Sequence, residues 1–287
     1  MNVFSVGILA PLRNLRDTCA GKDCRVSRLR NPLMNRKTGI RLGNEWFCGD
    51  ECFRQVLEIR IRQMRKIAST KGPRRKSRLP LGLLLLSRGC ITNAQLAAAL
   101  DQQRQLGGTL GQILCEMNFV TEQEVASAAA TQWGCPVFRP KSSLGQVQAH
   151  IPTALMNMYT MVPAHYSVSS NKLLVGFVHR IEHQVLQTIE DITCCITEPC
   201  VITCGHFRET IYHSVAHSND VTFDGISSAA EIARIAQSYA SQIGAEEARI
   251  GVCRDYVWVR LNREDYPTDL LFSISGDPSE DHNVARN

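Results

Sequence analysis

The sequence predicts an α+β protein built from a small cysteine-rich module, a duplicated helical unit and a mixed α/β region of short strands and helices. Three observations support this class. Two closely spaced cysteine pairs lie before residue 55, the arrangement of a small stapled module. A block that begins at Leu81 recurs 29 residues later with helical periodicity. After Pro136, short β-branched runs alternate with amphipathic helical patterns, which favours an α/β arrangement.

Length and composition are those of an ordinary soluble protein with two or three domains. The chain has 287 residues, of which 44% are apolar and 21% are charged. No stretch approaches the roughly 20 consecutive apolar residues of a membrane-spanning helix, and the N-terminal segment does not match a signal peptide. We therefore expect a cytoplasmic protein with no membrane span, in which most of the 12 cysteines are thiols or metal ligands.

Residues 12–68 form the cysteine-rich module. Cys19 and Cys24 are one pair, and Cys48 and Cys52 are a second pair that follows after 23 residues. Four thiolates are a ligand set that zinc prefers in structural sites, where no position stays open for catalysis. The second pair lies at the start of a helix predicted over 49–68, as in treble-clef zinc fingers. We predict a structural zinc site; the alternative is four unrelated thiols.

Positive charge is concentrated in one part of the chain. The net charge is +5, but residues 54–78 hold ten Lys or Arg and one acid, so the rest of the chain sums to −4. Residues 69–78, which include Gly72-Pro73, are predicted to be a basic linker. Such a segment beside a zinc module favours contacts to nucleic-acid phosphates. Aromatic residues are almost absent from it, however, and a solvated surface or a docking face for an acidic partner is the alternative.

The duplicated unit fills residues 79–135. In each copy a threonine, Thr92 or Thr121, is followed three residues later by Gln or Glu, which is the form of a helix-starting capping box. Gly89 and Asn118 mark the preceding turns, because Gly and Asn most readily take the left-handed conformation that ends a helix. Each copy is therefore predicted to be a short helix, a turn and a second helix, so the unit has four helices with pseudo-twofold symmetry.

Residues 136–218 and 224–275 are predicted to form two small α/β lobes, and residues 276–287 a disordered tail. The polar segment 216–223 between the lobes is predicted to be a loop. The predicted strands are 161–168, 172–178, 199–204, 247–253, 256–261 and 270–274. The predicted helices are 181–193, 206–215 and 227–243.

The remaining cysteines and histidines give no catalytic motif. Cys200 and Cys204 are spaced to share one face of the predicted strand 199–204, and Cys194 and Cys195 precede them. Buried cysteine behaves as a small apolar residue, so we expect these thiols in the core. The histidines have no nucleophile or carboxylate at a recognisable spacing, and we therefore expect no enzyme activity.

The repeat resembles the MshEN-type domain, the type II secretion system protein E N-terminal domain of secretion and type IV pilus assembly ATPases. That family carries two motifs of the form R-L-G-x2-L-x3-G-x-I-x4-L-x3-L-x2-Q, joined by five residues, and the copies here are 80–103 and 109–132. The resemblance continues more weakly to about residue 275, through segments similar to the small α/β lobes of those ATPases.

Some MshEN domains bind cyclic di-GMP through both motifs, so the resemblance implies this ligand and a set of contact positions. The residues at those positions are Leu81, Gly82, Leu96, Leu100, Gln103, Leu110, Gly111 and Gln132. The leading arginine of the motif is replaced by Pro80 and Thr109, which can neither stack on a guanine nor form a fork with a phosphate. Arg78 lies two residues upstream of Pro80 and is a candidate substitute. The alternative is that both motifs serve only helix packing.

The ATPase core of that family needs a phosphate-binding G-x4-G-K-[ST] loop. The one Gly-Lys pair in this chain, Gly21-Lys22, is followed by Asp23, so the resemblance covers the regulatory region without the motor. We therefore predict a non-enzymatic regulatory or adaptor protein that senses cyclic di-GMP. The resemblance points to secretion or pilus machinery as its protein partner. A zinc-containing nucleic-acid-binding protein that uses residues 54–78 is the alternative.

Overall fold

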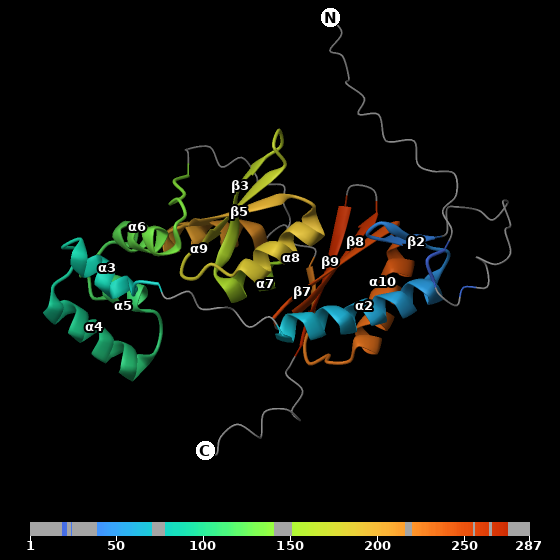
Figure 1. Cartoon of the computed structure of the whole chain (residues 1–287), viewed down its shortest axis with the longest axis horizontal. Coiled ribbons are helices and arrows are strands. Elements are labelled where there is room, and N and C mark those ends of the chain that lie inside the picture. The colour runs from blue at the N-terminus through green and yellow to red at the C-terminus, as the bar shows by residue number, and fades with distance from the viewer. Residues whose placement is uncertain are drawn as a thin grey trace, which may run out of the picture.

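The chain folds into both helices and strands, as the predicted α+β class requires. The structure, a computed structural model, describes residues 19–21, 24, 39–70, 78–140, 151–215, 220–254, 256–263 and 266–274. Most of the predicted linker 69–78 and all of the predicted tail 276–287 lie outside these ranges. Figure 1 shows a group of helices at one end of the molecule, a three-stranded sheet in the middle and a six-stranded sheet at the other end.

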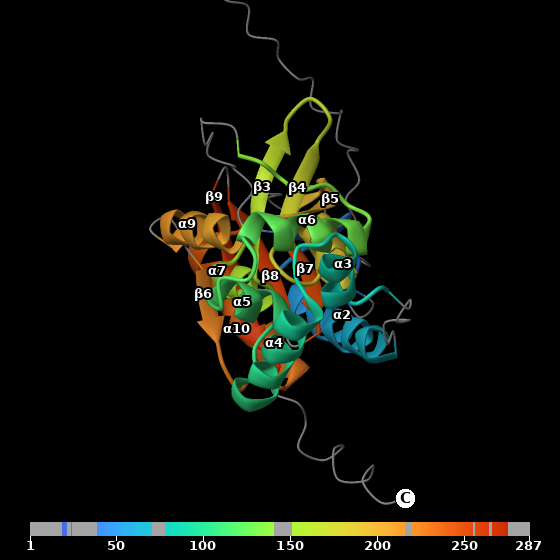
Figure 2. The ribbon, with the colours of Figure 1, turned by 90° about the vertical axis from the view of Figure 1, so that its left-hand side faces the viewer.

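The group of helices lies between residues 81 and 133, all of which the structure describes. Its members are α3 (Leu81–Ser87), α4 (Asn93–Leu106), α5 (Leu110–Glu116) and α6 (Glu122–Trp133). Thr92 and Thr121 close capping boxes at the starts of α4 and α6, as predicted. Gly89 and Asn118 have φ angles of +70° and +55° in the turns before them. Because α3 packs against α6 and α4 against α5, each short helix contacts the long helix of the other pair. Figure 2 looks onto this group from its own end of the molecule.

The middle lobe is a three-stranded sheet of order β3-β4-β5, with β3 antiparallel and β5 parallel to β4. Its elements are α7 (Thr153–Tyr159), β3 (Met161–Ser167), β4 (Lys172–Phe177), α8 (His183–Thr193), β5 (Ile196–Val201) and α9 (Cys204–Val215). The predicted strand 199–204 is wrong at its end, because Thr203 begins the next helix: its hydroxyl accepts a hydrogen bond from the His206 amide at 3.3 Å. Cys200 and Cys204 consequently do not share a strand face; Cys200 is buried in β5 and Cys204 is the first residue of α9.

The six-stranded sheet has the order β2-β1-β7-β8-β9-β6. Its C-terminal elements are β6 (Asp220–Phe223), α10 (Ala229–Ile243), β7 (Glu247–Cys253), β8 (Tyr256–Arg263) and β9 (Tyr266–Ser273). The loop predicted over 216–223 is wrong for its last four residues, which form β6, while 216–219 lie outside the described residues. β6 pairs in parallel with β9, and the Phe223 ring stacks on Phe272 with centroids 4.8 Å apart. The residues Asp220-Val221-Thr222-Phe223 do alternate as in a strand, but the run is short, and the contacts that stabilise it are distant in sequence.

The cysteine-rich module joins this second sheet. It contributes β1 (Ile40–Leu42), β2 (Glu45–Phe47) and α2 (Asp50–Thr70), and β1 pairs in parallel with β7. Phe53, Leu57 and Ile61 line one face of α2 and are buried in a core shared with α10 and with β7 to β9. The sequence divided 12–68 from 224–275; a short segment with little apolar surface instead completes its core on the C-terminal sheet.

The six-stranded sheet is covered on both faces. α2 and α10 lie on one face, whereas Trp258 and Leu271 point from the other face into the core of the middle lobe. There α8 packs against β7, and the Thr188 hydroxyl donates a hydrogen bond to the Val252 carbonyl at 3.1 Å. A Cβ on Gly251 would lie 2.4 Å from the Thr188 methyl group, so glycine permits this close approach. Within the described residues, no helix is long and apolar enough to cross a membrane.

Candidate metal centre and paired helix motifs

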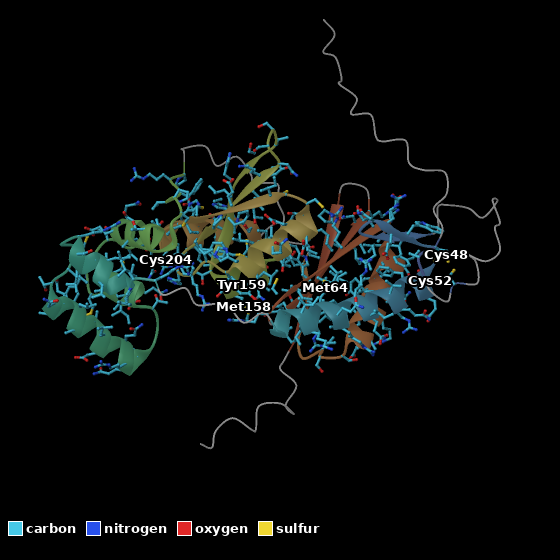
Figure 3. All side chains as sticks on the ribbon, viewed as in Figure 1. Cys48, Cys52, Met64, Met158, Tyr159 and Cys204 are labelled. Carbon is cyan, nitrogen blue, oxygen red and sulfur yellow. The ribbon has the colours of Figure 1, made fainter. Side chains whose placement is uncertain are left out.

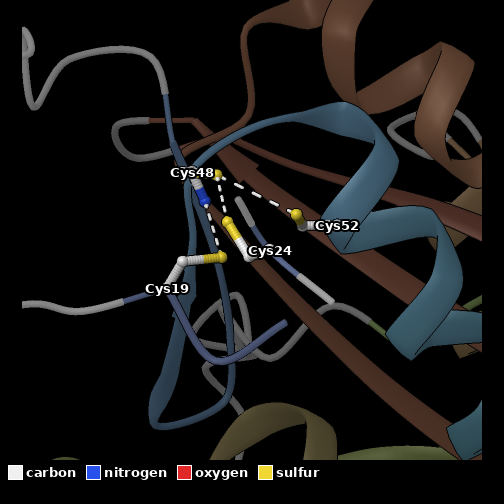
Figure 4. A group of neighbouring side chains, drawn as sticks. All are labelled: Cys19, Cys24, Cys48 and Cys52. Carbon is white, nitrogen blue, oxygen red and sulfur yellow. Dashed lines mark hydrogen bonds between the residues drawn. The ribbon is translucent and has the colours of Figure 1, made fainter. Parts of the chain in front are cut away.

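The four cysteines predicted as metal ligands meet at one point (Figure 4). The sulfur atoms of Cys19, Cys24, Cys48 and Cys52 all lie within 4.8 Å of one another. The Cys24–Cys48 and Cys48–Cys52 sulfur separations are 3.5 and 3.9 Å. A tetrahedral zinc site with Zn–S bonds of about 2.3 Å places its sulfurs about 3.8 Å apart. These two sulfur separations are therefore close to those that tetrahedral coordination of one ion requires.

Backbone contacts bring the two pairs together. The Cys24 amide donates to the Gly21 carbonyl at 3.2 Å, which closes a turn between the first two ligands. The Cys48 amide points at the Cys19 sulfur at 3.4 Å, as amides commonly do around metal thiolates. Cys52 lies in the first turn of α2. A Cβ on Gly21 would lie 3.2 Å from the Cys52 sulfur, so a side chain there would crowd the cluster.

The protonation chemistry of the cluster also fits a cation. Burial, together with the neighbouring thiols, raises the pKa of Cys52 from 9.0 to about 11, and the same causes raise the pKa of Cys48 further. Four sulfurs this close cannot all be thiolates unless a positive charge compensates them. A soft divalent ion with tetrahedral preference, such as zinc, would supply that charge and displace the protons. Four protein ligands would complete the coordination of such an ion, which is the arrangement of a structural and not a catalytic site.

The motif glycines of the helical group lie in equivalent surroundings. A Cβ on Gly82 would lie 2.7 Å from Leu96 and 3.2 Å from Leu110. A Cβ on Gly111 would lie 2.8 Å from Val125 and 3.4 Å from Leu81. Each short helix thus packs its glycine against the long helix of its own pair and a leucine of the other pair. The remaining leucine of the predicted contact positions, Leu100, is half-buried on α4.

The motif glutamines reach across from one pair to the other. The Gln103 side chain donates to the Gly108 carbonyl at 3.0 Å, and the Gln132 side chain donates to the Leu79 carbonyl at 2.6 Å. Gly108 and Leu79 each lie two residues before the Leu-Gly dipeptide of a copy. Each glutamine therefore ties the end of one long helix to the start of the other copy's short helix.

The positions of the missing motif arginines serve as helix starts. Pro80 precedes α3 without a side-chain cap, whereas the Thr109 hydroxyl accepts a hydrogen bond from the Gln112 amide at 3.4 Å and caps α5. Arg78 lies over the Trp133 ring, with its guanidinium carbon 3.7 Å from the ring centroid. The sequence identified Arg78 but not Trp133, whose position after the motif carries no periodic signal.

A pocket of about 220 Å³ separates the helical group from the middle lobe. Its lining includes Cys115, Glu122, His179, Cys204 and Arg208, which come from α5, α6, the segment that follows β4, and α9. The Glu122 carboxylate accepts a hydrogen bond from the Gly205 amide at 2.8 Å and so caps α9 from a different lobe. No local pattern in the sequence indicated this contact, since it joins residues 83 positions apart.

The basic helix α2 holds much of its charge in ion pairs. Arg54 pairs with Glu51 at 2.7 Å, Arg60 pairs with Glu45 at 2.8 Å, and Arg62 pairs with Glu58. These arginines are partly neutralised on their own surface, which weakens the nucleic-acid alternative. Residues 71–77, which carry four more basic residues, lie outside the described part of the chain.

The second group of cysteines does not form a site. Cys200 is buried, Cys195 and Cys204 are half-buried, and Cys194 is exposed. Cys194 ends α8 with a φ angle of +57° and contacts the guanidinium of Arg249. The expectation that all of these thiols are core residues is therefore wrong for Cys194.

No protein-family model matches the chain. A type IV pilus assembly ATPase, PilB of Thermus thermophilus, is 26% identical over 134 residues, which cover 44% of this chain and 14% of PilB. The chain thus spans only a small part of the curated relative that it matches.

Among solved structures, MshE with cdg aligns with a TM-score of 0.39 and 21% identity over 48% of this chain and 99% of that one. The N-terminal domain of XpsE aligns with a TM-score of 0.36 and 15% identity over 46% of this chain and 91% of that one. Through its sequence similarity to PilB, the chain carries a region that resembles part of a type IV pilus assembly ATPase, the class of protein that the repeated motif implied.

Proposed function

We propose that this chain is a non-enzymatic regulatory or adaptor protein in which the duplicated MshEN-like unit, α3–α6, binds cyclic di-GMP. The observation that carries this proposal is the reciprocal contact of the two motif glutamines. Gln103 and Gln132 bind equivalent carbonyls across the two helix pairs, and the two motif glycines lie in equivalent packing. A pseudo-twofold site suits a ligand that is itself twofold symmetric.

Further support comes from the relatives. MshE was solved with cdg, that is, cyclic di-GMP, and PilB is a pilus assembly ATPase that shares sequence with this chain. We propose a component of secretion or pilus machinery as the protein partner. In this proposal the zinc-stapled end of the molecule holds β1, β2 and α2 on the C-terminal sheet, while the helical end responds to the nucleotide.

Isothermal titration calorimetry of the full chain with cyclic di-GMP tests the proposed ligand. We expect saturable heat, with cyclic di-AMP as the control for the identity of the base. Gln132→Ala should weaken binding, whereas Gln123→Ala, at an exposed position on the same helix, should leave it unchanged. Absence of heat at ligand concentrations on the order of 100 μM would reduce the helical unit to a packing scaffold.

Metal analysis of the purified full chain tests the zinc site. We expect one zinc ion per chain, lost when Cys48 and Cys52 are both changed to serine. Cys90→Ser, which alters a half-buried thiol of the helical group, is the matched control and should retain the metal. Iron in place of zinc would correct the identity of the ion, and no metal in any preparation would refute the site.

A further inference from the structure

The basic side chains of the helical group differ in the groups that they contact. Between residues 78 and 135, all of which the structure describes, the basic side chains are Arg78, Arg88 and Arg104. Arg88 donates to the hydroxyls of Ser127 and Thr131 at 3.0 and 2.5 Å. Arg104 pairs with Asp101 at 2.8 Å. Within this described stretch, Arg78 makes its contact with an aromatic ring and has no acidic partner.

The ring beneath Arg78 is a fixed platform. Trp133 is half-buried and packs against both the middle core and the small cluster around Ala126, Ala129 and Val201. Its indole nitrogen is buried as well, so the edge of the ring points into the protein. Arg78 itself is exposed, so one face of its guanidinium rests on the indole and the other face is open to solvent.

The backbone beside Arg78 is held to the proposed ligand-binding motif. The carbonyl of Leu79, the next residue, accepts the 2.6 Å hydrogen bond from Gln132. Pro80 then fixes the entry into α3, which begins with Leu81-Gly82. Arg78 therefore lies directly beside the motif residues of both copies, and its position is set by Gln132 and Trp133, which are neighbours on α6.

A cyclic dinucleotide presents two purine planes and two phosphates. A guanidinium whose plane is held by an indole can stack a purine on its open face and donate a fork of hydrogen bonds to a phosphate. We propose that Arg78 is the residue that binds the base and phosphate of the cyclic dinucleotide, and that Trp133 is a positioning residue that keeps the guanidinium flat. This inference rests on the proposed function, since it assigns the charged contact of that same site.

The repeat makes the proposed contact one-sided. In the second copy the residue equivalent to Arg78 is Gly107, and in the first copy the residue equivalent to Trp133 is Arg104. The proposed site therefore offers one stacked guanidinium to a ligand that has two equal halves. Arg104 also provides a matched control, because it is an exposed arginine of the same unit that is already paired.

Calorimetry of full-length variants with cyclic di-GMP tests the assignment. Arg78→Ala should weaken binding at least about tenfold, and Arg78→Lys should also weaken it, because an ammonium keeps the charge but loses the plane. Arg104→Ala should change affinity less than about twofold. Trp133→Phe keeps a ring and should bind within about threefold of the wild type, whereas Trp133→Leu should lose affinity as Arg78→Ala does.

The outcomes separate this inference from the proposed function. A wild-type chain that gives no heat overturns both. A wild-type chain that binds, together with Arg78→Ala that binds equally well, overturns the assignment of Arg78 alone. Equal losses of affinity in Trp133→Phe and Trp133→Leu would show that the indole is needed for packing and not as a stacking surface for Arg78.

Discussion

Gly82 and Gly111 are each surrounded by branched side chains of two helices. Alanine is favoured over glycine inside a helix by about 1 kcal/mol, so a glycine in the first turn needs another cause. Here the cause is contact: a Cβ would lie 2.7 Å from Leu96 at one position and 2.8 Å from Val125 at the other. Both the packing alternative and the ligand-binding proposal depend on this close approach.

Gly82→Ala should destabilise the chain by about 1–3 kcal/mol, because the added methyl group overpacks the contact with Leu96. Combining it with Leu96→Ala should recover part of that loss, so the two substitutions should be non-additive. Urea unfolding of the two single variants and the double variant measures the coupling. Strict additivity would mean that the two side chains do not compete for this space.

Among single residues, the sequence indicated the four clustered cysteines and the positions of the repeated motif, but not how the motif residues meet. The spacing of the four cysteines indicated that their sulfurs could meet, and they do lie within 4.8 Å of one another. The bond from Gln103 to Gly108 is local, but the bond from Gln132 to Leu79 depends on how the helix pairs cross, which periodicity does not specify. Trp133 carried no signal because its role depends on Arg78, 55 positions earlier in the chain.

Among the elements, α9 shows most clearly how one lobe completes another. Its first turn receives hydrogen-bond acceptors from two sources: the Thr203 hydroxyl, next to it in sequence, and the Glu122 carboxylate from α6. An anionic acceptor at a helix N-terminus is favourable because the amides there lack helical partners. The contact joins the helical group to the middle lobe at the edge of the pocket.

Glu122→Ala should therefore lower the free energy of unfolding by about 1 kcal/mol, and Glu122→Gln by less, since the amide keeps an acceptor. Glu116→Ala is the control, because Glu116 is exposed and lines the same pocket. Guanidinium unfolding curves of the three variants give the comparison. A loss in Glu116→Ala equal to that in Glu122→Ala would indicate a general charge effect and no specific cap.

His206, in the first turn of α9, should make the folded chain less stable at acidic pH. It is buried, its ring lies 5.5 Å from that of Phe138, and burial lowers its pKa below the ordinary 6.5. Below pH 6.5 the unfolded chain takes up a proton that the folded chain resists, so stability falls as pH falls. Urea unfolding between pH 7.5 and pH 5.5 should show a smaller loss for His206→Gln than for the wild type. His165→Gln, at an exposed position, should keep the wild-type slope.

The sequence predicted elements well where the signal is local and poorly where pairing is distant. The capping boxes at Thr92 and Thr121 and the turns at Gly89 and Asn118 depend on neighbouring residues. The strand Asp220–Phe223 has only four residues, and its pairing with β9 is distant in sequence. The union of β1 with β7 likewise has no local signature, since β1 has three residues and its partner lies near the other end of the chain.

At the scale of the whole molecule, the two candidate sites lie far apart. Figure 3 shows Cys48 and Cys52 at the end of the molecule opposite the helical group, with the middle lobe between them. The four clustered cysteines pack against the core of the six-stranded sheet, and the proposed ligand-binding residues belong to α3, α4, α5 and α6. The two sites should accordingly serve stability and ligand binding separately.

Removing the metal with a chelator should lower the midpoint of thermal unfolding by at least about 5 °C, because β1, β2 and α2 lose their staple. The affinity for cyclic di-GMP at 20 °C should change less than about twofold, since the helical group does not contact the cluster. Calorimetric scans and titrations on the same samples provide both numbers. A parallel loss of affinity and stability would mean that the two ends are coupled.

The repeated motifs of α3–α6 are proposed to form the binding surface for cyclic di-GMP. The most direct test is an amide and methyl nuclear magnetic resonance titration of the full chain with this nucleotide. We expect saturable shifts concentrated at Gly82, Gln103, Gly111 and Gln132, with none at the cysteine cluster. Shifts that saturate elsewhere, or a spectrum that does not change, would contradict it.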